Sequence, residues 1–316
     1  RVAATAAGEC RLTTASAAGA PDPVTATCSL AAWALHASKA ANSQGAAMRR
    51  ARTDPMFDAK PLPPAAVPAG SSSRHPSRIL KHDPRQLTKM NSTVLLDAIE
   101  HETAADPRWC VLWLHGLGAD GNDFAPIVPD LVRRDWPAIR FVFPHAPVRA
   151  VTINNGARMR AWYDIRDFDL ANRADHEGVA ESVAQVDALI AREATRGIPP
   201  ERILLAGFSQ GGAITLAAGL SRSTPLGGLV ALSTYLPMGL DQARASLQPA
   251  AASQPMFMGH GVFDPVVPVA GGEAAARAFR DFGFDVQWRR YPMQHSVCAE
   301  EIRDLGDWMT ARFAAG

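Results

Sequence analysis

Short runs of apolar residues alternate with helical segments from residue 90 to the end of the chain. A run such as 109–115, WCVLWLH, leaves no polar face, which is typical of a strand covered on both sides. Between the runs, apolar residues recur at helical spacing, as Val179, Val183 and Val186 do. This alternation predicts an α/β fold with a mostly parallel central sheet and helices on both of its faces.

The boundaries of the expected strands and helices follow from the same pattern. The last strand alternates in polarity and is therefore expected at the edge of the sheet. The stretch 145–175 has no clear period, and a loop this long in a compact domain is usually functional. The expected strands are 92–99, 109–115, 139–144, 202–209, 226–233, 255–261 and 284–292, and the expected helices are 122–134, 176–195, 211–220, 272–283 and 300–313.

Residues 1–89 differ from the rest in composition and charge. They hold 12 Lys and Arg against 5 Asp and Glu, whereas residues 90–316 hold 20 against 26. The segment is rich in Ala, Ser, Thr and Pro, and it buries too little apolar surface to offset the entropy of ordering. We expect a disordered tail with one short candidate helix at 28–41, followed by a folded domain at 90–316. A non-native or upstream-translated extension before Met90, a targeting peptide and an interaction tail are the alternative explanations.

The composition excludes several classes of function. A net charge of +1 gives no basic footprint for nucleic acid or an anionic membrane surface. The four cysteines show no C-x-x-C spacing, and no apolar run approaches the roughly 18 residues of a membrane-spanning helix. These features predict a soluble, cytoplasmic protein with no metal site and no transmembrane segment.

A G-x-S-x-G motif at 207–211 carries the sharpest chemical signal. It lies between an expected strand and an expected helix, which is the setting of a nucleophile elbow. The glycines on both sides let the backbone turn tightly and present the Ser209 hydroxyl above the sheet. A glycine-rich turn with an incidental serine is the alternative, and the strand–turn–helix context disfavours it.

Two histidines, His260 and His295, follow Ser209 in the chain. A serine hydroxyl needs a base and an orienting carboxylate, and in this architecture the order along the chain is Ser, then Asp or Glu, then His. His260 precedes any acid in its loop and therefore breaks that order. Asp264 and His295 each follow an expected strand, so the sequence predicts Ser209, Asp264 and His295 as a catalytic triad. An Asp-Pro turn at Asp264 and a capping role for His295 are the alternatives.

Two backbone N–H groups are candidates for an oxyanion hole. Gln210 stands at the start of an expected helix, where the dipole favours negative charge. Leu117 lies in the glycine-rich loop 115–118 after an early strand. Such donors each contribute about 3–4 kcal/mol to transition-state stabilisation.

The same loop also matches a dinucleotide-binding pattern. Gly116, Gly118 and Gly121 spell G-x-G-x-x-G between a strand and a helix. Asp120 and Asp123, however, put negative charge where a pyrophosphate would bind. The next strand also ends without the acidic residue that holds a ribose hydroxyl. We therefore expect no nucleotide cofactor.

Seven stretches, taken together and in order, resemble the carboxylesterase, acyl-protein thioesterase and lysophospholipase family of the α/β-hydrolases. The resemblance implies an α/β-hydrolase fold and a serine hydrolase that needs neither a metal nor a cofactor. The stretches are LHGLGADGNDF (114–124), FVFPHAP (141–147), MRAWYDI (159–165), LAGFSQGGA (205–213), LSTYLP (232–237), GHGVFDPVVP (259–268) and HSVCAEEI (295–302).

The resemblance also implies roles for single residues. It implies Ser209, Asp264 and His295 as the triad, with Leu117 and Gln210 as the oxyanion donors. It places Trp162 near the acyl pocket, and we expect substrate choice to depend on loop 145–175 and on apolar residues around Leu117, Trp162 and Val267.

The substrates implied are carboxylic esters with short to medium acyl chains, and lysophospholipids or acyl-protein thioesters are the further candidates. A homodimer remains open, as does a non-catalytic ligand-binding scaffold, because a fold does not by itself give a function.

Four other residues are expected to have structural roles. Cys110 lies inside a buried strand, and Cys298 is expected to pack at a helix start, with a redox-sensitive thiol as the alternative. His115 and His260 are expected to support their loops through hydrogen bonds.

Overall fold

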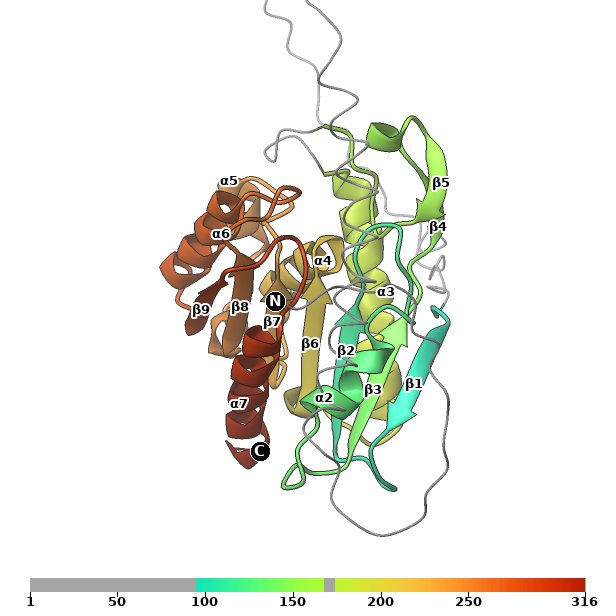
Figure 1. Cartoon of the computed structure of the whole chain (residues 1–316), viewed down its shortest axis with the longest axis vertical. Coiled ribbons are helices and arrows are strands. Elements are labelled where there is room, and N and C mark those ends of the chain that lie inside the picture. The colour runs from blue at the N-terminus through green and yellow to red at the C-terminus, as the bar shows by residue number, and fades with distance from the viewer. Residues whose placement is uncertain (1–94, 168–173, 316) are drawn as a thin grey trace, which may run out of the picture.

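The computed structural model describes residues 95–167 and 174–315 (Figure 1). The expected tail at 1–89, its candidate helix and its three alternative explanations lie outside the described residues. Within these ranges, no helix combines the length and the apolar character that crossing a membrane requires.

A seven-stranded sheet forms the centre of the described structure, in the order β1-β3-β2-β6-β7-β8-β9. Only β1 runs antiparallel to its neighbour, and all other pairs in this sheet are parallel. This confirms the mostly parallel sheet and the edge position of the last strand. The strands are β1 (Ala98–Glu102), β2 (Trp109–Leu114), β3 (Ile139–Pro144), β6 (Ile203–Phe208), β7 (Gly228–Leu232), β8 (Met256–Gly261) and β9 (Val286–Tyr291).

Helices cover both faces of the sheet, because successive side chains of the central strands point to opposite sides. Leu112 in β2 packs into one apolar cluster with α3, α4 and α6, whereas Trp113 packs into a second cluster with α2 and α7. Figure 1 shows these two layers on either side of the strands. The helices are α2 (Val128–Leu131), α3 (His176–Thr195), α4 (Gln210–Leu220), α5 (Leu240–Ser246), α6 (Val269–Asp281) and α7 (Ala299–Ala315).

Two expectations were wrong in detail. The helix expected at 122–134 is only a 3-10 turn, Ala125–Ile127, followed by the four-residue α2. Pro126 and Pro129 lack the N–H groups that a longer helix would use, and the backbone is extended again at Val132. The strand expected at 92–99 begins only at Ala98.

The stretch 145–175 contains a hairpin that its sequence pattern did not indicate. β4 (Val148–Val151) pairs antiparallel with β5 (Ala157–Arg160). Asn155 and Gly156 supply the two positive φ angles of the turn. Each strand has only four residues, which is too few to establish a period, so only the turn residues could have signalled them. The helix α5 was also missed.

The parallel strands place their carboxyl ends at one edge of the sheet, which is where binding sites form in open α/β sheets. The loops that follow β2, β6, β7, β8 and β9 therefore converge there. These loops contain Leu117 and the expected triad, and Gln210 begins α4 directly after Ser209.

Candidate active site

Ser209 occupies a sharp turn between β6 and α4. Its backbone has φ +55° and ψ −117°, a conformation that side-chain-bearing residues rarely adopt. The neighbouring glycines are required by close packing. A Cβ on Gly207 would lie 2.4 Å from the backbone of Gly211, and one on Gly211 would lie 2.3 Å from the carbonyl oxygen of Leu114. The strained serine is thus held on a rigid strand-to-helix junction.

Backbone contacts with the neighbouring strand hold this turn in place. The N–H of Ser209 donates to the carbonyl of Leu232 at 2.9 Å, and the hydroxyl of Thr234 donates to the carbonyl of Ser209 at 2.7 Å. Ser209 is 6% exposed, so its hydroxyl lies in a partly desolvated position.

The structure brings Ser209, His295 and Asp264 into one chain of hydrogen bonds. His295 Nε2 lies 2.9 Å from Ser209 Oγ, and His295 Nδ1 lies 2.6 Å from Asp264 Oδ2. Asp264 comes from the loop after β8 and His295 from the loop after β9. All three side chains are buried. Because a carboxylate only accepts, Nδ1 carries the proton and Nε2 is left to accept one from the serine.

Backbone and side-chain donors surround the Asp264 carboxylate. Its Oδ1 accepts the N–H groups of Val266 and Val267, each at 2.8 Å. Burial alone would raise the pKa of this carboxyl, but its electrostatic attraction to the His295 ring and the hydrogen bonds from His260, His295 and Val267 outweigh burial. The resulting pKa lies well below the usual range for aspartate, so Asp264 stays ionised.

His260 supports this loop, as expected. Its Nε2 donates to the carbonyl of Val267 at 3.0 Å and lies 3.5 Å from Asp264 Oδ2. The sequence excluded His260 as the base from its place in the chain, but it gave no sign of this second contact with the carboxylate.

The loop after β2 is held by His115. Its Nδ1 donates to the carbonyl of Gly116 at 2.7 Å, and its Nε2 accepts the N–H of Ala146 at 3.1 Å. Burial lowers the pKa of His115 to about 4. The neutral ring with a proton on Nδ1 satisfies both partners, which confirms the expected supporting role.

Leu117 and Gln210 are the expected oxyanion donors. Leu117 lies in the loop after β2, and Gln210 lies in the first turn of α4. Gly118 takes φ +77° and donates its N–H to the carbonyl of Arg160 at 2.9 Å, which ties the loop to β5. Gln210 is buried, and its backbone begins α4 directly after Ser209.

The side chain of Gln210 ties α4 to the segment after β5, a contact that the sequence did not indicate. Its Oε1 accepts the N–H of Trp162 at 2.8 Å, and its Nε2 donates to the carbonyl of Tyr163 at 2.8 Å. The indole of Trp162 donates to the carbonyl of His115 at 2.9 Å. The three segments around Ser209 are thereby joined by side-chain bonds.

The residues expected near the substrate lie deeper than a pocket wall. Trp162 is fully buried, and Val267 is 1% exposed and packs against Val266 and Tyr235. Tyr235 itself exchanges a hydrogen bond of 2.7 Å with the hydroxyl of Tyr163. In the sequence, Tyr235 is part of the LSTYLP stretch at 232–237, and no spacing rule identifies it as a site residue.

The alternative dinucleotide reading of the loop finds no support in its packing. A Cβ on Gly121 would lie 2.3 Å from the carbonyl oxygen of Phe143, so this glycine serves contact with β3. The helix that follows is only four residues long. Across the described residues, no group of three or more His, Cys, Asp or Glu side chains could hold a metal ion.

The two described cysteines have structural positions. Cys110 is fully buried in β2, as expected. Cys298 directly precedes α7 and contacts the backbone of Glu301 and Glu300, and burial raises the pKa of its thiol. A raised pKa disfavours the reactive thiolate, which supports the helix-start reading.

Comparisons with known proteins place this geometry in context. The model of the phospholipase/carboxylesterase family matches residues 98–312. An acyl-protein thioesterase 1 from Neurospora crassa is 37% identical over 227 residues, covering 69% of this chain and 91% of that protein. A probable carboxylesterase from Oryza sativa subsp. japonica is 37% identical over 209 residues, covering 65% of this chain and 78% of that protein.

Solved structures of related proteins have a similar fold. The crystal structure of Arabidopsis thaliana SOBER1 superposes with a TM-score of 0.62 at 34% identity, covering 65% of this chain and 99% of that chain. The structure of Zea mays acyl-protein thioesterase 2 superposes with a TM-score of 0.58 at 26% identity, covering 69% of this chain and 100% of that chain.

Proposed function

Because the chain belongs to the phospholipase/carboxylesterase family of α/β-hydrolases, we propose that it hydrolyses carboxylic esters and thioesters through an acyl-enzyme on Ser209. The observation that carries this proposal is the continuous chain of hydrogen bonds from Ser209 through His295 to Asp264. The strained backbone of Ser209 supports the same role, because such strain is typical of active sites and a non-catalytic scaffold would not need it.

The first half of the reaction uses the proton-accepting His295. Ser209 Oγ attacks the carbonyl carbon as His295 Nε2 takes its proton, and a tetrahedral oxyanion forms. The backbone N–H groups of Leu117 and Gln210 stabilise that oxyanion. When it collapses, the bond to the alcohol or thiol breaks, and His295 protonates the departing group.

The second half repeats these steps with water. His295 takes a proton from the water as its oxygen attacks the acyl-enzyme, and the proton returns to Ser209 Oγ when the acid leaves. Asp264 stays ionised throughout because its pKa is held far below neutrality, and it stabilises the imidazolium that forms twice per turnover.

The relatives support the proposed substrate class. The acyl-protein thioesterases and carboxylesterases among the relatives support esters of small molecules or lipids, and acylated proteins, as substrates. Trp162 acts through Gln210 and the carbonyl of His115 to shape the oxyanion loop, and the N–H of Val267 helps to position the Asp264 carboxylate.

We also propose a division of the chain into residues 1–89 and a hydrolase domain at 90–316, which contains the matched range 98–312. A cytoplasmic location and a homodimer are further proposals. Fractionation of the native source and light scattering of the purified chain test these two.

Hydrolysis of p-nitrophenyl acetate and of an acyl thioester by the purified chain tests the proposed activity. Wild-type protein turns both over, and Ser209→Ala lowers kcat by at least 10³-fold with an unchanged unfolding transition. A second candidate function, ligand binding without catalysis, would gain support if folded wild-type protein and Ser209→Ala were equally inactive.

A further inference from the structure

A histidine on the strand that precedes Asp264 contacts the same carboxylate as His295. His260 lies in β8, four residues before Asp264, and is 1% exposed. Its Nε2 donates to the carbonyl of Val267 at 3.0 Å and lies 3.5 Å from Asp264 Oδ2, so one N–H faces both acceptors. His295 Nδ1 reaches the same Oδ2 at 2.6 Å. Two histidines from different segments therefore converge on one carboxylate oxygen.

The peptide groups of Val267 link the two sides of this arrangement. The N–H of Val267 donates to Asp264 Oδ1 at 2.8 Å, and its carbonyl accepts the N–H of His260. The turn 264–267 is thus bonded to its own carboxylate at one point and to β8 at another. Because β8 is fully buried and paired with a strand on each side, His260 fixes where this turn lies relative to the sheet.

The polar contacts of the His260 ring are all at Nε2. A carbonyl only accepts, so Nε2 carries the proton, and Nδ1 has no hydrogen-bond partner among the described residues. An unsatisfied buried nitrogen destabilises a fold. A histidine is therefore a poor choice at this buried position unless its Nε2 end contributes to function.

Both α6 and β9 hold the ring in this orientation. The ring of Trp288 in β9 packs beside it, with 6.0 Å between the ring centroids. A Cβ on Gly272 in α6 would come within 3.0 Å of Nδ1 and Cε1 of His260 and of Cη2 of Trp288. Glycine at 272 is what leaves the His260 ring its place, and the ring has little room to turn away from Val267.

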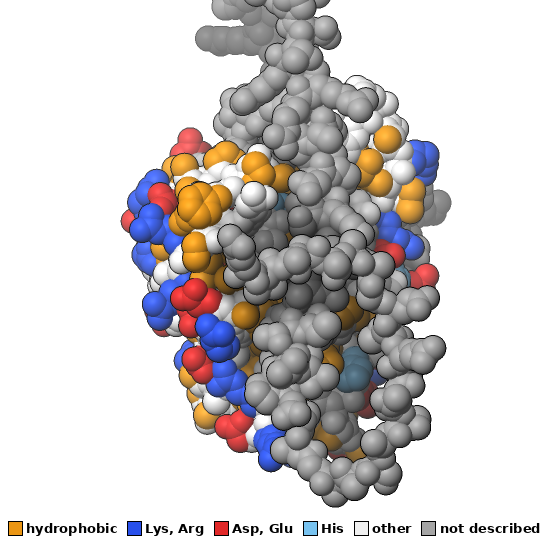
Figure 2. All heavy atoms as spheres, viewed as in Figure 1, with side chains coloured by type: hydrophobic (Ala, Val, Ile, Leu, Met, Phe, Trp, Pro, Cys, Tyr) orange, Lys and Arg blue, Asp and Glu red, His pale blue; other side chains and the backbone are white. Residues whose placement is uncertain are grey.

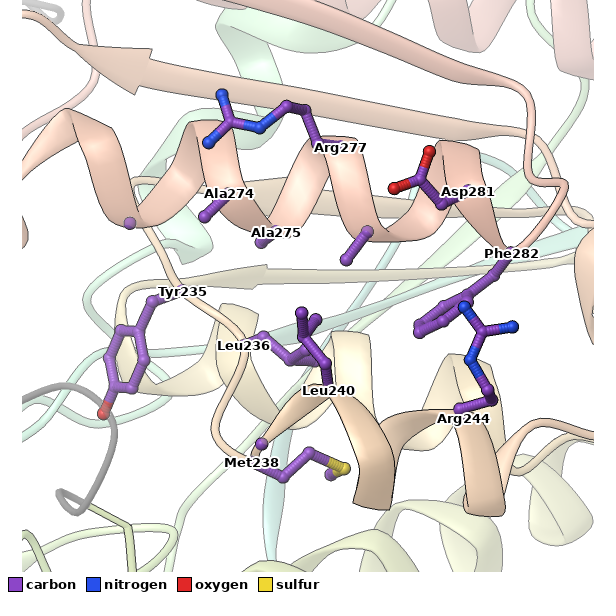
Figure 3. A pocket seen from close by; sticks show the side chains of 13 residues that line it. Tyr235, Leu236, Met238, Leu240, Arg244, Ala274, Ala275, Arg277, Asp281 and Phe282 are labelled. Atoms are coloured by element: carbon purple, nitrogen blue, oxygen red, sulfur yellow. The ribbon is translucent and has the colours of Figure 1, made fainter.

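Gly272 belongs to the inner face of α6, which is turned toward β8. The outer face carries the exposed Arg277 and Arg280, and Figure 2 shows charged side chains along this side of the molecule. Ala274 and Ala275 border the groove between α6 and the segment before α5 (Figure 3). The lining of that groove does not include Gly272, so a substitution at Gly272 acts on the His260 ring and leaves the groove lining as it is.

We propose that His260 is a positioning residue of the triad, which holds the Asp264 carboxylate at the place from which Asp264 orients His295. The inference rests on the proposed function for the reaction itself, and it adds a fourth residue to the three that the order along the chain selects. Because His260 acts through Asp264 and not on the substrate, its loss lowers kcat and leaves KM unchanged.

Two substitutions of His260 in the full chain test this role. His260→Leu removes the N–H, and we expect kcat per folded molecule for p-nitrophenyl acetate to fall at least tenfold while KM stays within twofold. His260→Gln can place an amide N–H at the Val267 carbonyl, so it restores kcat to within threefold of the wild type. Urea unfolding curves give the folded fraction. A kcat of His260→Leu within twofold of the wild type, or equal losses in the two variants, overturns the inference.

A further variant leaves the histidine in place and decides the case if His260→Leu does not fold. Gly272→Ala pushes the ring away from the Val267 carbonyl, so we expect kcat per folded molecule to fall at least fivefold. The matched control is Gly219→Ala, at a buried glycine of α4 where the new Cβ crowds the side chain of Leu229. The control keeps kcat within twofold, and equal kcat values for the two glycine variants overturn the inference.

A spectroscopic measurement separates this inference from the proposed chemistry. The short bond between His295 Nδ1 and Asp264 gives its proton a low-field NMR resonance, which His295→Ala removes. His260→Leu shifts or broadens that resonance, whereas His260→Gln preserves it. If the wild-type chain turns over no ester or thioester while the resonance still depends on His260, the proposed hydrolysis fails and the positioning role stands. If turnover is as proposed and the resonance is the same in His260→Leu, the positioning role alone fails.

Discussion

At the scale of single residues, the orientation of His295 depends on the charge state of Asp264. Asp264 receives two backbone N–H bonds on Oδ1 and the imidazole N–H on Oδ2, so both oxygens must accept. No neutral side chain of the same shape can satisfy all three donors.

Asp264→Asn is therefore expected to lower kcat by roughly 10³- to 10⁴-fold while the protein stays folded. The amide keeps one accepting oxygen for Val266 and Val267 but turns an NH₂ group toward His295, which favours the wrong tautomer. Steady-state kinetics measures the change in kcat, and a urea unfolding curve checks that the variant stays folded. A loss smaller than tenfold would mean that His295 does not rely on this carboxylate.

The candidate triad could be predicted from the sequence, whereas the hydrogen bonds that hold its surroundings in place could not. Ser209, Asp264 and His295 follow from a motif, a chain order and strand ends, which are local properties. The contacts of Gln210 with Trp162 and Tyr163 join segments that are far apart in sequence, and the contact of His260 with Val267 depends on how the Asp264 loop folds back. Tertiary packing creates those contacts, and no spacing in one sequence reports it.

At the scale of elements, continuous apolar runs identified the buried strands well, because a strand covered on both faces tolerates no polar position. The helix expected at 122–134 does not form as one continuous helix, because Pro126 and Pro129 lack the N–H groups that it would need. The short hairpin β4–β5 could not be predicted because four residues per strand are too few to establish a period.

The junction of α4 with the segment after β5 gives a test at this scale. Gln210→Ala leaves the N–H of Trp162 and the carbonyl of Tyr163 without their partner, and each lost buried bond costs about 1–3 kcal/mol. We expect a loss of about 2–4 kcal/mol in the free energy of unfolding, measured in urea.

The matched control is Gln242→Ala on α5, an exposed glutamine whose removal is expected to change the free energy of unfolding by less than about 0.5 kcal/mol. Equal effects for the two variants would show that the Gln210 side chain does not tie the segments together.

At the scale of the whole molecule, two buried groups give the stability opposite dependences on pH. Burial lowers the pKa of folded His115 to about 4, below the ordinary histidine value of about 6.5, so its contribution to stability is complete above pH 6.5 and is lost as the pH falls toward 4. Glu301 is fully buried and its pKa is raised well above 4.5, mainly by burial, so its contribution is lost as the pH rises above 4.5.

Replacing His115 by glutamine is expected to remove the first dependence only. Between pH 7.5 and pH 4.5 the wild-type chain should lose up to about 3 kcal/mol more stability than His115→Gln, because the unfolded histidine takes up a proton that the folded one refuses. The effect of Glu301 is common to both proteins and cancels in the difference. His101→Gln, at an exposed histidine of β1, is the control and should parallel the wild type. Parallel curves for His115→Gln and the wild type would contradict the buried neutral histidine.

The central claim is that Ser209 is the nucleophile and that His295 activates it. A fluorophosphonate reacts with such a serine by forming an Oγ–P bond and releasing fluoride, and the adduct is stable enough for peptide mapping by mass spectrometry. We predict a single adduct on Ser209 in the wild-type chain, formed at least 10²-fold more slowly in His295→Ala. An adduct on another residue, or a rate on Ser209 that does not depend on His295, would contradict the proposed mechanism.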